Sequence, residues 1–428
     1  MKKVLILSYF FPPRPGMGSM RFYGISKYLP RFGWEPIIIT AKLPSHHSHD
    51  VKVIETKYFD INKLFKSICG FDHKMGIFDQ LHGTQYKKKG NWFIIINKLI
   101  KLSQDILNFP DEHIGWYTYA LKAASDLILS DNINAIISTS YPVTAHLVAN
   151  KLKSKYKIPW IADYRDLWSQ NIYKNKLFLL KYIETILEYN TIQKADYLVT
   201  VDSDVDRLKS LHKDKNIYHI TNGYDPDELS ISPFFESNKF TITYTGGTLY
   251  YGKRDPSMLF QAINEMINDD IIDRLNIELL FYCPKEIWLI NKIKEYNLND
   301  IVTLKGYIPR SDVLREQRRA HLLLLMQWNH PSERSAYSGK LFEYLAARRP
   351  IIAFGPGGIV NKLIYDTEAG HYVNNLIELK KYISAYYKEY LQTGEVKYKG
   401  NQNIYKYNYH SIAKLYASIL DNLITATG

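Results

Sequence analysis

The chain has 428 residues, a length that favours more than one domain. Of these residues, 46% are hydrophobic and 23% are charged, a balance typical of folded globular proteins. Lysine and arginine total 55 against 43 aspartates and glutamates, so the net charge is +12 and anionic partners are favoured. The basic residues are dispersed and form no nucleic-acid-binding motif, which favours phosphorylated substrates or an anionic membrane surface over nucleic acid. Cys69 and Cys283 match no metal-ligand spacing and indicate a reducing compartment such as the cytoplasm.

A βαβ unit with glycines in its first turn opens the chain. Residues 4–9 predict a buried strand rather than a signal peptide, residues 19–32 a helix and residues 34–40 a second strand. The turn between strand and helix lacks the G-x-G-x-x-G spacing, so a dinucleotide fingerprint fits poorly. We expect Gly16 and Gly18 to let the backbone approach a phosphate, with an ordinary tight turn as the alternative.

Residues 43–115 show no βα rhythm. Within them, Lys87–Lys89 precede an amphipathic stretch at residues 92–109 with a basic side. Such a stretch could lie on an anionic membrane, or it could pack on the core with its basic side in water. No run of about 18 apolar residues exists, so we expect no membrane span.

The rhythm becomes regular after residue 117. A strand at residues 135–139 runs into Ser140, and a strand at residues 160–162 runs into Asp163, Arg165 and Asp166. Ligands of open α/β sheets bind beyond the carboxyl ends of strands. We therefore expect Arg165 and a carboxylate, Asp163 or Asp166, to meet sugar or acceptor hydroxyls and phosphate, with Ser140 on the acceptor side. An Arg–Asp pair that only fixes the loop is the alternative.

A second α/β unit follows a linker at residues 229–238. Its first strand, residues 240–245, leads into another glycine-rich turn with Gly246, Gly247 and Thr248 and then Lys253 and Arg254. The chain therefore predicts two doubly wound domains, at residues 1–230 and 239–403. The basic pair at the end of this turn either binds an anion or is simply solvated.

The helix predicted at residues 340–347 is the strongest candidate for nucleotide binding. Ser338 and Gly339 precede it, and an apolar strand at residues 351–354 follows it. The free amides and positive dipole at a helix N-terminus bind anions. We expect the backbone from Ser338 to Leu341 and the charge of Lys340 to hold a nucleotide diphosphate, and Glu343 to accept from ribose hydroxyls. A surface helix before a core strand is the alternative.

Several strings resemble glycosyltransferase family 4. S-G-K-L-F-E-Y-L-A-A from Ser338 resembles the donor-nucleotide helix of the subgroup with R-D-L-W and S-K-L-x-E-Y-x-A motifs, and R-D-L-W itself begins at Arg165. N-G-Y-D from Asn222 resembles the segment that closes the family's N-terminal domain. The resemblance implies the GT-B fold: two doubly wound Rossmann-like domains face each other across a cleft, and a C-terminal helix, about residues 404–428, joins the first.

The resemblance also implies an activity. Family members transfer a sugar from a nucleotide-diphosphate sugar with retention of configuration and without a metal or other cofactor. Lys253 and Arg254 match the Arg and Lys that hold the donor pyrophosphate, although here they are adjacent. The family's Glu-x7-Glu pair is incomplete, because Ser335 stands where the first Glu belongs and Glu333 has the wrong spacing. Asp202-Ser203-Asp204 has the spacing of a metal grip but is typical of a helix start.

The implied partners are a UDP- or GDP-sugar and a lipid-linked or oligosaccharide acceptor in bacterial surface polysaccharide (capsule or O-antigen) synthesis. The implied location is the cytoplasm, including the inner face of the membrane. Two other functions stay open on this scaffold. A nucleotide-sugar epimerase would need acid and base groups and no acceptor, and a non-catalytic binding protein would fit the missing first Glu.

Overall fold

The computed structural model describes residues 1–14, 16–45, 50–69, 102–171, 177–201, 205–230, 237–247, 249–250 and 252–427. Lys87–Lys89, Asp202–Asp204, Thr248 and most of the predicted stretch 92–109 lie outside these ranges. Backbone contacts divide the chain into two compact units. Unit 1 comprises Met1–Ile220 and Ala413–Gly428, and unit 2 comprises Thr221–Ile412.

Unit 1 is built on a parallel seven-stranded sheet with the order β3-β2-β1-β4-β5-β6-β7. Its strands are β1 (Lys2–Leu7), β2 (Trp34–Ala41), β3 (Lys52–Thr56), β4 (Ile133–Ser140), β5 (Trp160–Tyr164), β6 (Tyr197–Thr200) and β7 (Asn216–His219). Its helices are α1 (Met17–Tyr28), α2 (Ile61–Cys69), α5 (Tyr117–Ser130), α6 (Thr144–Tyr156), α7 (Phe178–Ile192), α8 (Val205–Leu211) and most of α15 (Tyr409–Thr427).

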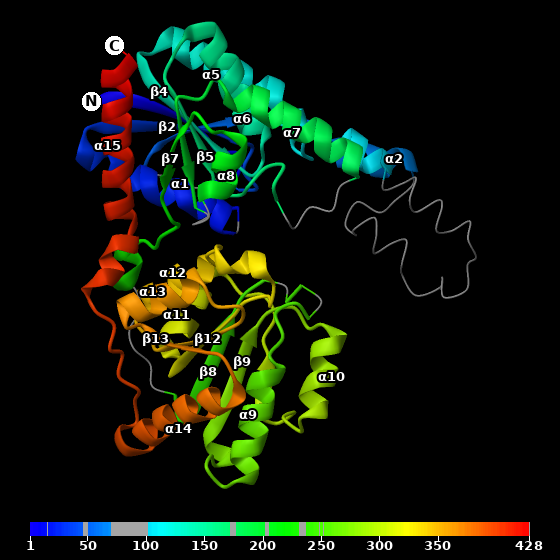
Figure 1. The fold of residues 1–428 in the computed structure, drawn as a ribbon, viewed down its shortest axis with the longest axis vertical. Coiled ribbons are helices and arrows are strands. Elements are labelled where there is room, and N and C mark those ends of the chain that lie inside the picture. Colours follow the sequence, from blue (N-terminus) through cyan, green and yellow to red (C-terminus); the bar gives the residue numbers. More distant parts are fainter. Residues whose placement is uncertain are drawn as a thin grey trace. The chain divides into compact units, whose positions relative to one another are not determined.

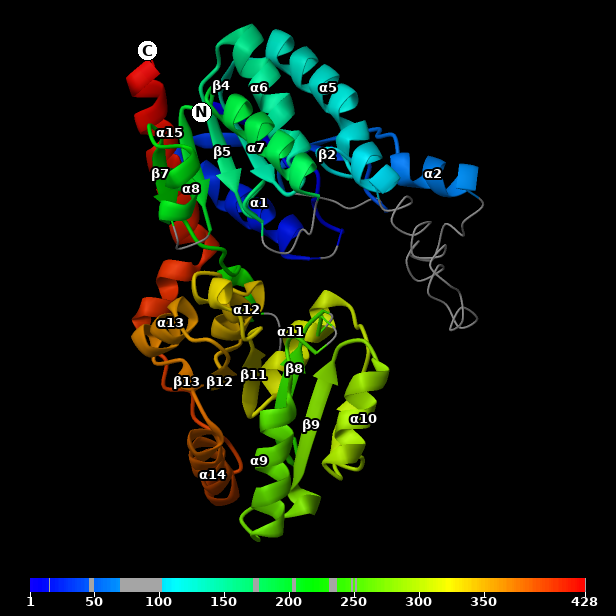
Figure 2. The same ribbon diagram turned by 45° about the vertical axis from the view of Figure 1, so that its right-hand side comes forward.

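The central strands of this sheet are apolar on both faces because helices cover both faces. In β1, Leu5 pairs with Ile37 of β2 on one side and Ile136 of β4 on the other, and all three side chains are buried. Helices α5, α6 and α7 lie side by side on one face (Figure 2). Helix α1 contacts α15 through the rings of Phe22 and Tyr416. This arrangement is the doubly wound topology that the strand and helix alternation predicts.

Strand β3 is an element that the sequence pattern did not reveal. It lies at the edge of the sheet beside β2, where Ile39 pairs with Ile54. Most of its side chains are exposed or half-buried, so the strand shows neither a continuous apolar run nor a clean alternation. The irregular region 43–115 therefore contains at least one strand of the sheet.

Unit 2 is built on a parallel six-stranded sheet with the order β10-β9-β8-β11-β12-β13 (Figure 1). Its strands are β8 (Phe240–Thr245), β9 (Ile277–Tyr282), β10 (Val302–Leu304), β11 (Leu322–Met326), β12 (Ile351–Phe354) and β13 (Gly370–Val373). Its helices are α9 (Ser257–Asn268), α10 (Ile287–Glu295), α11 (Arg310–Arg319), α12 (Gly339–Ala347), α13 (Ile359–Thr367) and α14 (Leu376–Thr393).

Two apolar clusters hold the two faces of this sheet. One includes Phe260 of α9, Leu289 of α10 and Leu379 of α14, and the other includes Leu341 of α12 and Leu363 of α13. The order of strands reverses direction between β8 and β11, because β9 and β10 lie on one side of β8 and β11 to β13 on the other. Such a switch point is where open α/β sheets bind ligands.

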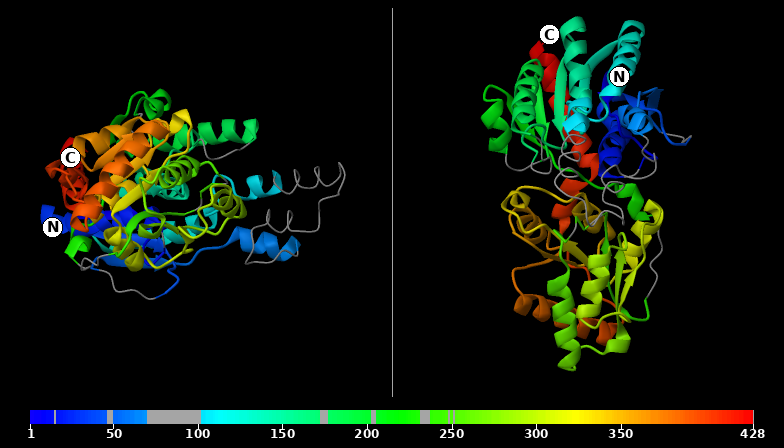
Figure 3. Two further views of the ribbon diagram at one scale, coloured as in Figure 1. Left: turned by 90° about the horizontal axis from the view of Figure 1, so that it is seen from below. Right: turned by 90° about the vertical axis from the view of Figure 1, so that its right-hand side faces the viewer.

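Helix α15 starts at Tyr409 in unit 2 and continues from Ala413 in unit 1. Its Asp421 carboxylate accepts from the Nζ of Lys2, at 2.5 Å, and from the Nε1 of Trp34, at 3.0 Å. The red helix accordingly lies beside the blue N-terminal elements in Figure 3. None of the helices in the described ranges is both long enough and apolar enough to cross a bilayer.

Candidate functional site

The carboxyl edge of the second sheet carries a polar pocket of about 600 Å³. The turn after β8 contributes Lys253, and the segments after β11, β12 and β13 contribute Trp328, Gly355 and Asn374. The Nζ of Lys253 lies 4.1 Å from the centre of a Trp328 ring, over its face. The pocket therefore combines a cation held by an aromatic ring with loops from both sides of the switch point.

Helix α12 begins at the same edge of the sheet. Ser338 is its N-cap, with extended backbone and a side chain that accepts no capping hydrogen bond, and Gly339 is its first residue. The helix carries no acidic residue in its first turn, so its positive dipole end has no counter-charge there. Leu341 is fully buried in the core, so its side chain is unavailable to a nucleotide; only its backbone lies at the helix start.

Lys340 is held on the strand β8 side of α12. Its Nζ donates to the Oη of Tyr244 at 2.8 Å and lies 4.5 Å from the centre of the same ring. Gly246 follows β8, and a Cβ at this position would overlap the end of the Lys340 side chain as it is placed, so the glycine leaves room for the amine. Burial first, and then the nearby charge of Arg254, lower the pKa of Lys340 to about 7, while Glu343 opposes the shift. An anion placed here would favour the protonated amine.

Arg254 lies close enough to Lys340 for its charge to lower the pKa of that amine, and Lys253 precedes it in the same turn. Its guanidinium lies 4.9 Å from the centre of the Tyr250 ring. Its Nε is buried and has no hydrogen-bond acceptor among the described residues. Gly247 faces open space, since a Cβ there would meet nothing within 4 Å. The turn after β8 therefore presents positive charge and accessible backbone, while the predicted Thr248 is outside the described residues.

Glu343 lies one turn into α12 and is held by Arg310. A guanidinium nitrogen of Arg310 lies 2.5 Å from one Glu343 oxygen, and the Nε2 of Gln317 donates to the other at 3.3 Å. Arg310 also pairs with Glu228 at 3.0 Å, and burial raises the pKa of Glu228. Glu343 is therefore oriented by a charged partner and not free on the helix surface.

Sequence reasoning missed Arg310. The residue follows Pro309 and starts α11, the helix after β10, so it lies at the carboxyl edge of the sheet. Its place between the short strand β10 and the start of a helix was the available signal. Tyr244 was also missed, because it is one ring in an apolar strand, and only the structure shows its hydroxyl and its ring against Lys340.

Glu333 is not an exposed substitute for the missing first Glu of the Glu-x7-Glu pair. It lies in a short 3₁₀ turn between β11 and α12 and is buried. Burial raises the pKa of its carboxyl to about 7. The chain therefore offers no exposed carboxylate at this point of the loop.

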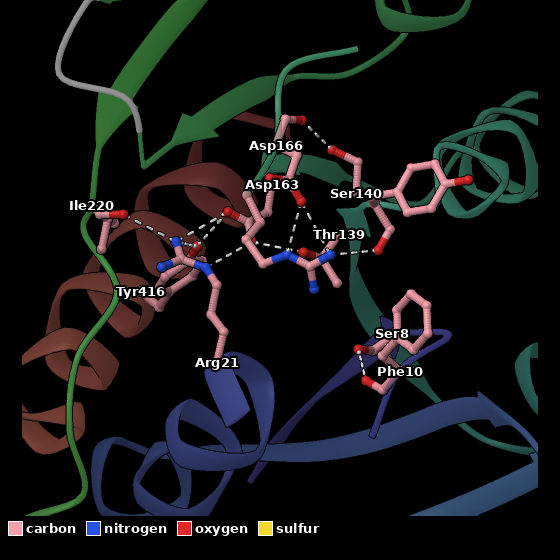
Figure 4. Close-up of polar contacts among 11 residues, drawn as sticks. Ser8, Phe10, Arg21, Thr139, Ser140, Asp163, Asp166, Ile220 and Tyr416 are labelled. Atoms are coloured by element: carbon pink, nitrogen blue, oxygen red, sulfur yellow. Dashed lines mark hydrogen bonds and ion pairs between the residues drawn. The ribbon is translucent and has the colours of Figure 1, made fainter. Parts of the chain in front are cut away.

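In unit 1, Asp163 is the centre of a closed polar network at the end of β5 (Figure 4). Arg21 of α1 contacts both of its carboxylate oxygens, at 3.0 and 3.1 Å, and both side chains are 0% exposed. Thr139 and Tyr416 donate to the same carboxylate, and Arg21 also donates to the backbone oxygen of Ile220. The prediction that Asp163 contacts substrate does not fit this complete burial.

The other predicted residues of unit 1 surround this network. Arg165 donates to the backbone oxygen of Tyr141 at 2.7 Å and pairs with Asp166 at 3.3 Å. The Ser140 hydroxyl is buried and donates to the backbone oxygen of Asp166 at 2.9 Å. A Cβ on Gly18 would overlap the Arg165 guanidinium, so that glycine allows the arginine to approach α1. The loop is thus held by Arg165 and Ser140, and the Asp166 side chain is half exposed.

Two further predictions concern the backbone at Gly16 and the capacity to bind a metal ion. Gly16 caps α1 with a φ of 102°, a conformation that L side chains rarely adopt. In the described ranges, no group of three or more His, Cys, Asp or Glu side chains converges as ligands to a metal ion would.

Comparison with known proteins identifies the fold. No protein-family model and no curated protein matches the sequence. Solved structures match over the whole chain, and three of them illustrate the range. Sucrose-phosphate synthase from Thermosynechococcus elongatus has a TM-score of 0.60 at 14% identity, with 100% of both chains covered. An E. coli structure described as trehalose-6-phosphate bound with UDP-2-fluoro glucose has a TM-score of 0.59 at 11% identity, covering 98% of this chain and 99% of that one.

A putative UDP-N-acetylglucosamine 2-epimerase from Listeria monocytogenes is the third, with a TM-score of 0.50 at 11% identity, covering 98% of this chain and 96% of that one. The chain has the GT-B fold, which confirms the predicted fold class. Identities this low show the fold alone, and the fold hosts more than one reaction. The activity must therefore be argued from the site.

Proposed function

We propose that this protein is a glycosyltransferase that moves a sugar from a UDP- or GDP-sugar to an acceptor. The observation that carries the proposal is the pair of like charges, Lys340 and Arg254, at the start of α12, with Lys253 before Arg254 in the same turn and Glu343 one turn further along. Cations beside a helix start that has no carboxylate in its first turn can bind a diphosphate. A carboxylate held in one orientation can accept hydrogen bonds from ribose hydroxyls.

The chemistry of the reaction matches these charges. Breaking the bond between the sugar and the diphosphate leaves negative charge on the departing phosphate oxygen. Lys340, Arg254, Lys253 and the α12 amides would stabilise that charge without rearranging, which is the largest single contribution in many enzymes. The amine of Lys340 gains protonation when the diphosphate binds, because its pKa starts near 7.

The remaining roles are proposals that extend from the family 4 resemblance. Gly246 and Gly247 let the backbone approach the donor, and Ser338, Gly339 and the Leu341 backbone form the helix start. Arg165 and Asp166 belong to the acceptor side in unit 1, with Gly16 and Gly18 in the turn before α1. The reaction retains configuration and needs no metal or other cofactor. The acceptor is a lipid-linked glycan of surface polysaccharide synthesis, handled at the inner face of the cell membrane.

Thermal unfolding with UDP, GDP and ADP tests the donor site. A nucleotide at 100 times its dissociation constant adds about 2.7 kcal/mol to the free energy of unfolding, which is readily visible as a rise in Tm. We expect one nucleotide to raise Tm in the wild type and Glu343→Ala to lose the rise. Glu295→Ala, which removes a carboxylate from an exposed ion pair on α10, is the matched control and keeps it. No shift with any nucleotide would contradict the proposal.

Turnover separates the three possible functions of the scaffold. The nucleotide-sugar that carries the nucleotide found to raise Tm is incubated with the protein, with and without acceptor, and its sugar is followed by NMR. A transferase releases the nucleotide with the acceptor present and leaves the sugar configuration of the donor intact without it. An epimerase changes that configuration without an acceptor, and a non-catalytic protein binds the nucleotide and does neither.

A further inference from the structure

Helix α7 of unit 1 turns its apolar side outward. Phe178, Leu179 and Tyr182 are 87%, 66% and 59% exposed, although side chains of this size are usually buried. Ile183, Ile186 and Tyr189 are exposed further along the same helix. Spacings of three and four residues place these side chains on one side of the helix, as a continuous stripe. We call this stripe the α7 face.

The polar side of α7 is turned inward. Glu184 and Glu188 are both buried. Glu188 accepts from the Oη of Tyr164 at 3.0 Å and from the backbone nitrogen of Ser169 at 2.8 Å. The helix lies alongside α6 (Figure 2). Its distribution of side chains is the reverse of that of an ordinary surface helix, because its acids are buried and large apolar side chains are exposed. An exposed apolar stripe of this kind marks an interaction surface.

Among the described residues, the exposed charges on α7 and in the pocket beside it are positive. Lys181 is the exposed charged residue of the helix, and exposed Lys194 follows its end. Lys151 and Lys194 also line a pocket of about 590 Å³ between α6 and α7. No acidic side chain is among the described residues that line this pocket, whose apolar part includes Leu147 and Leu187.

We propose that the α7 face docks unit 1 on an anionic lipid bilayer. Apolar side chains beside lysines, with the acids buried, match the boundary between acyl chains and negatively charged headgroups. Large apolar side chains enter the acyl boundary, while Lys151, Lys181 and Lys194 meet the headgroups. The proposal rests on α7 alone and not on the donor site in unit 2. It would supply the membrane contact that a lipid-linked acceptor requires.

Co-sedimentation of the full chain with vesicles tests the proposal. We expect binding to vesicles of phosphatidylcholine mixed with phosphatidylglycerol and much weaker binding to phosphatidylcholine alone. The variant Phe178→Ser/Leu179→Ser should lose about tenfold in partition coefficient for each large side chain removed from the bilayer. The variant Lys181→Glu/Lys194→Glu should lose the difference between the two kinds of vesicle.

Leu275→Ser/Ile287→Ser is the matched control, because these side chains are equally exposed but belong to unit 2. It should bind vesicles as the wild type does. Equal binding by the α7 variants and the wild type would overturn the proposal. So would a dimer, measured by light scattering, that Phe178→Ser/Leu179→Ser abolishes while no vesicle binding is seen. Circular dichroism and the Tm without nucleotide show that the variants are folded, and the nucleotide-dependent rise in Tm reports separately on the donor site.

Discussion

The two sheets of this protein use charge in opposite ways at the same structural position. At the end of β5 in unit 1, Arg21 and Asp163 are fully buried and satisfy each other, with Tyr416 and Thr139 completing the network. At the end of β8 in unit 2, Lys340 and Arg254 lie close together with the same sign of charge, and the hydroxyl of Tyr244 accepts from the lysine.

The difference separates a structural role from a binding role. A buried charge whose partners are all protein groups holds elements together, and losing one partner is costly. Like charges held together at a sheet edge raise the free energy of the unliganded protein and gain most when an anion arrives. The expectation that ligands bind beyond the carboxyl ends of strands therefore indicates two sites. The site in unit 1 is already occupied by side chains of the protein itself.

The largest effect should come from breaking the closed network. Asp163→Ala leaves the Arg21 guanidinium buried without its carboxylate, and we expect a loss of about 3–5 kcal/mol in the free energy of unfolding. Urea unfolding, followed by a spectroscopic signal from unit 1, measures this loss in the free energy of unfolding. Asp166→Ala, which removes a half-exposed carboxylate from the same loop, should change stability by less than about 1 kcal/mol. If the Asp163→Ala protein were as stable as the wild type but had no turnover, Asp163 would have a role in the reaction and not in stability.

Removing the lysine of this pair of like charges should affect binding and not stability. Lys340→Met keeps the length and apolar body of the side chain but loses a charged donor, which should weaken UDP binding by about 10–100-fold. Tm without nucleotide should stay the same or rise, because burial already disfavours the charged amine. Isothermal titration calorimetry measures the affinity, and Lys362→Met on the exposed side of α13 is the control. Equal UDP affinities in the two variants would remove Lys340 from the site.

The pH dependence of binding sharpens the same point. The pKa of Lys340 is about 7 in the free protein, and a bound diphosphate raises it. Protonated lysine binds better, so affinity should be nearly constant well below pH 7 and fall above it, by at most about tenfold per pH unit. UDP-glucose is the probe, because its diphosphate does not titrate in this range. Lys340→Met should bind with no such slope, and an unchanged slope in that variant would assign the titration elsewhere.

The smallest effect should come from the residue that orients Glu343. Arg310→Gln removes the ion pair with Glu343 but leaves Gln317 as a partner, so we expect a fall of about fivefold in affinity for UDP. The loss should be confined to ribose recognition, so the preference for UDP over 2′-deoxy-UDP should shrink while the pH slope stays. An intact preference would leave Arg310 with a structural role only.

Local pattern was enough to predict much of unit 2. The strand predicted at residues 351–354 coincides with β12, and the helix predicted at residues 340–347 differs from α12 by one residue at its start. Both signals lie within a few consecutive residues: an apolar run that ends at glycine, and a helical spacing that stops before Pro350. Strands β3 and β13 were missed because each lies at a sheet edge with part of its surface exposed, which blurs the pattern.

The sequence by itself determined the types of most elements, β3 and β13 excepted, together with the two-sheet fold class and the stretches that could carry a site. Only the tertiary structure decided which of those residues face water. Asp163 and Arg165 are two positions apart and looked equivalent, yet Asp163 is sealed by Arg21, 142 positions earlier, and by Tyr416, 253 positions later. Arg310 reaches Glu343 across 33 positions in the same way. Burial depends on partners that are distant in the chain, and short motifs carry no record of them.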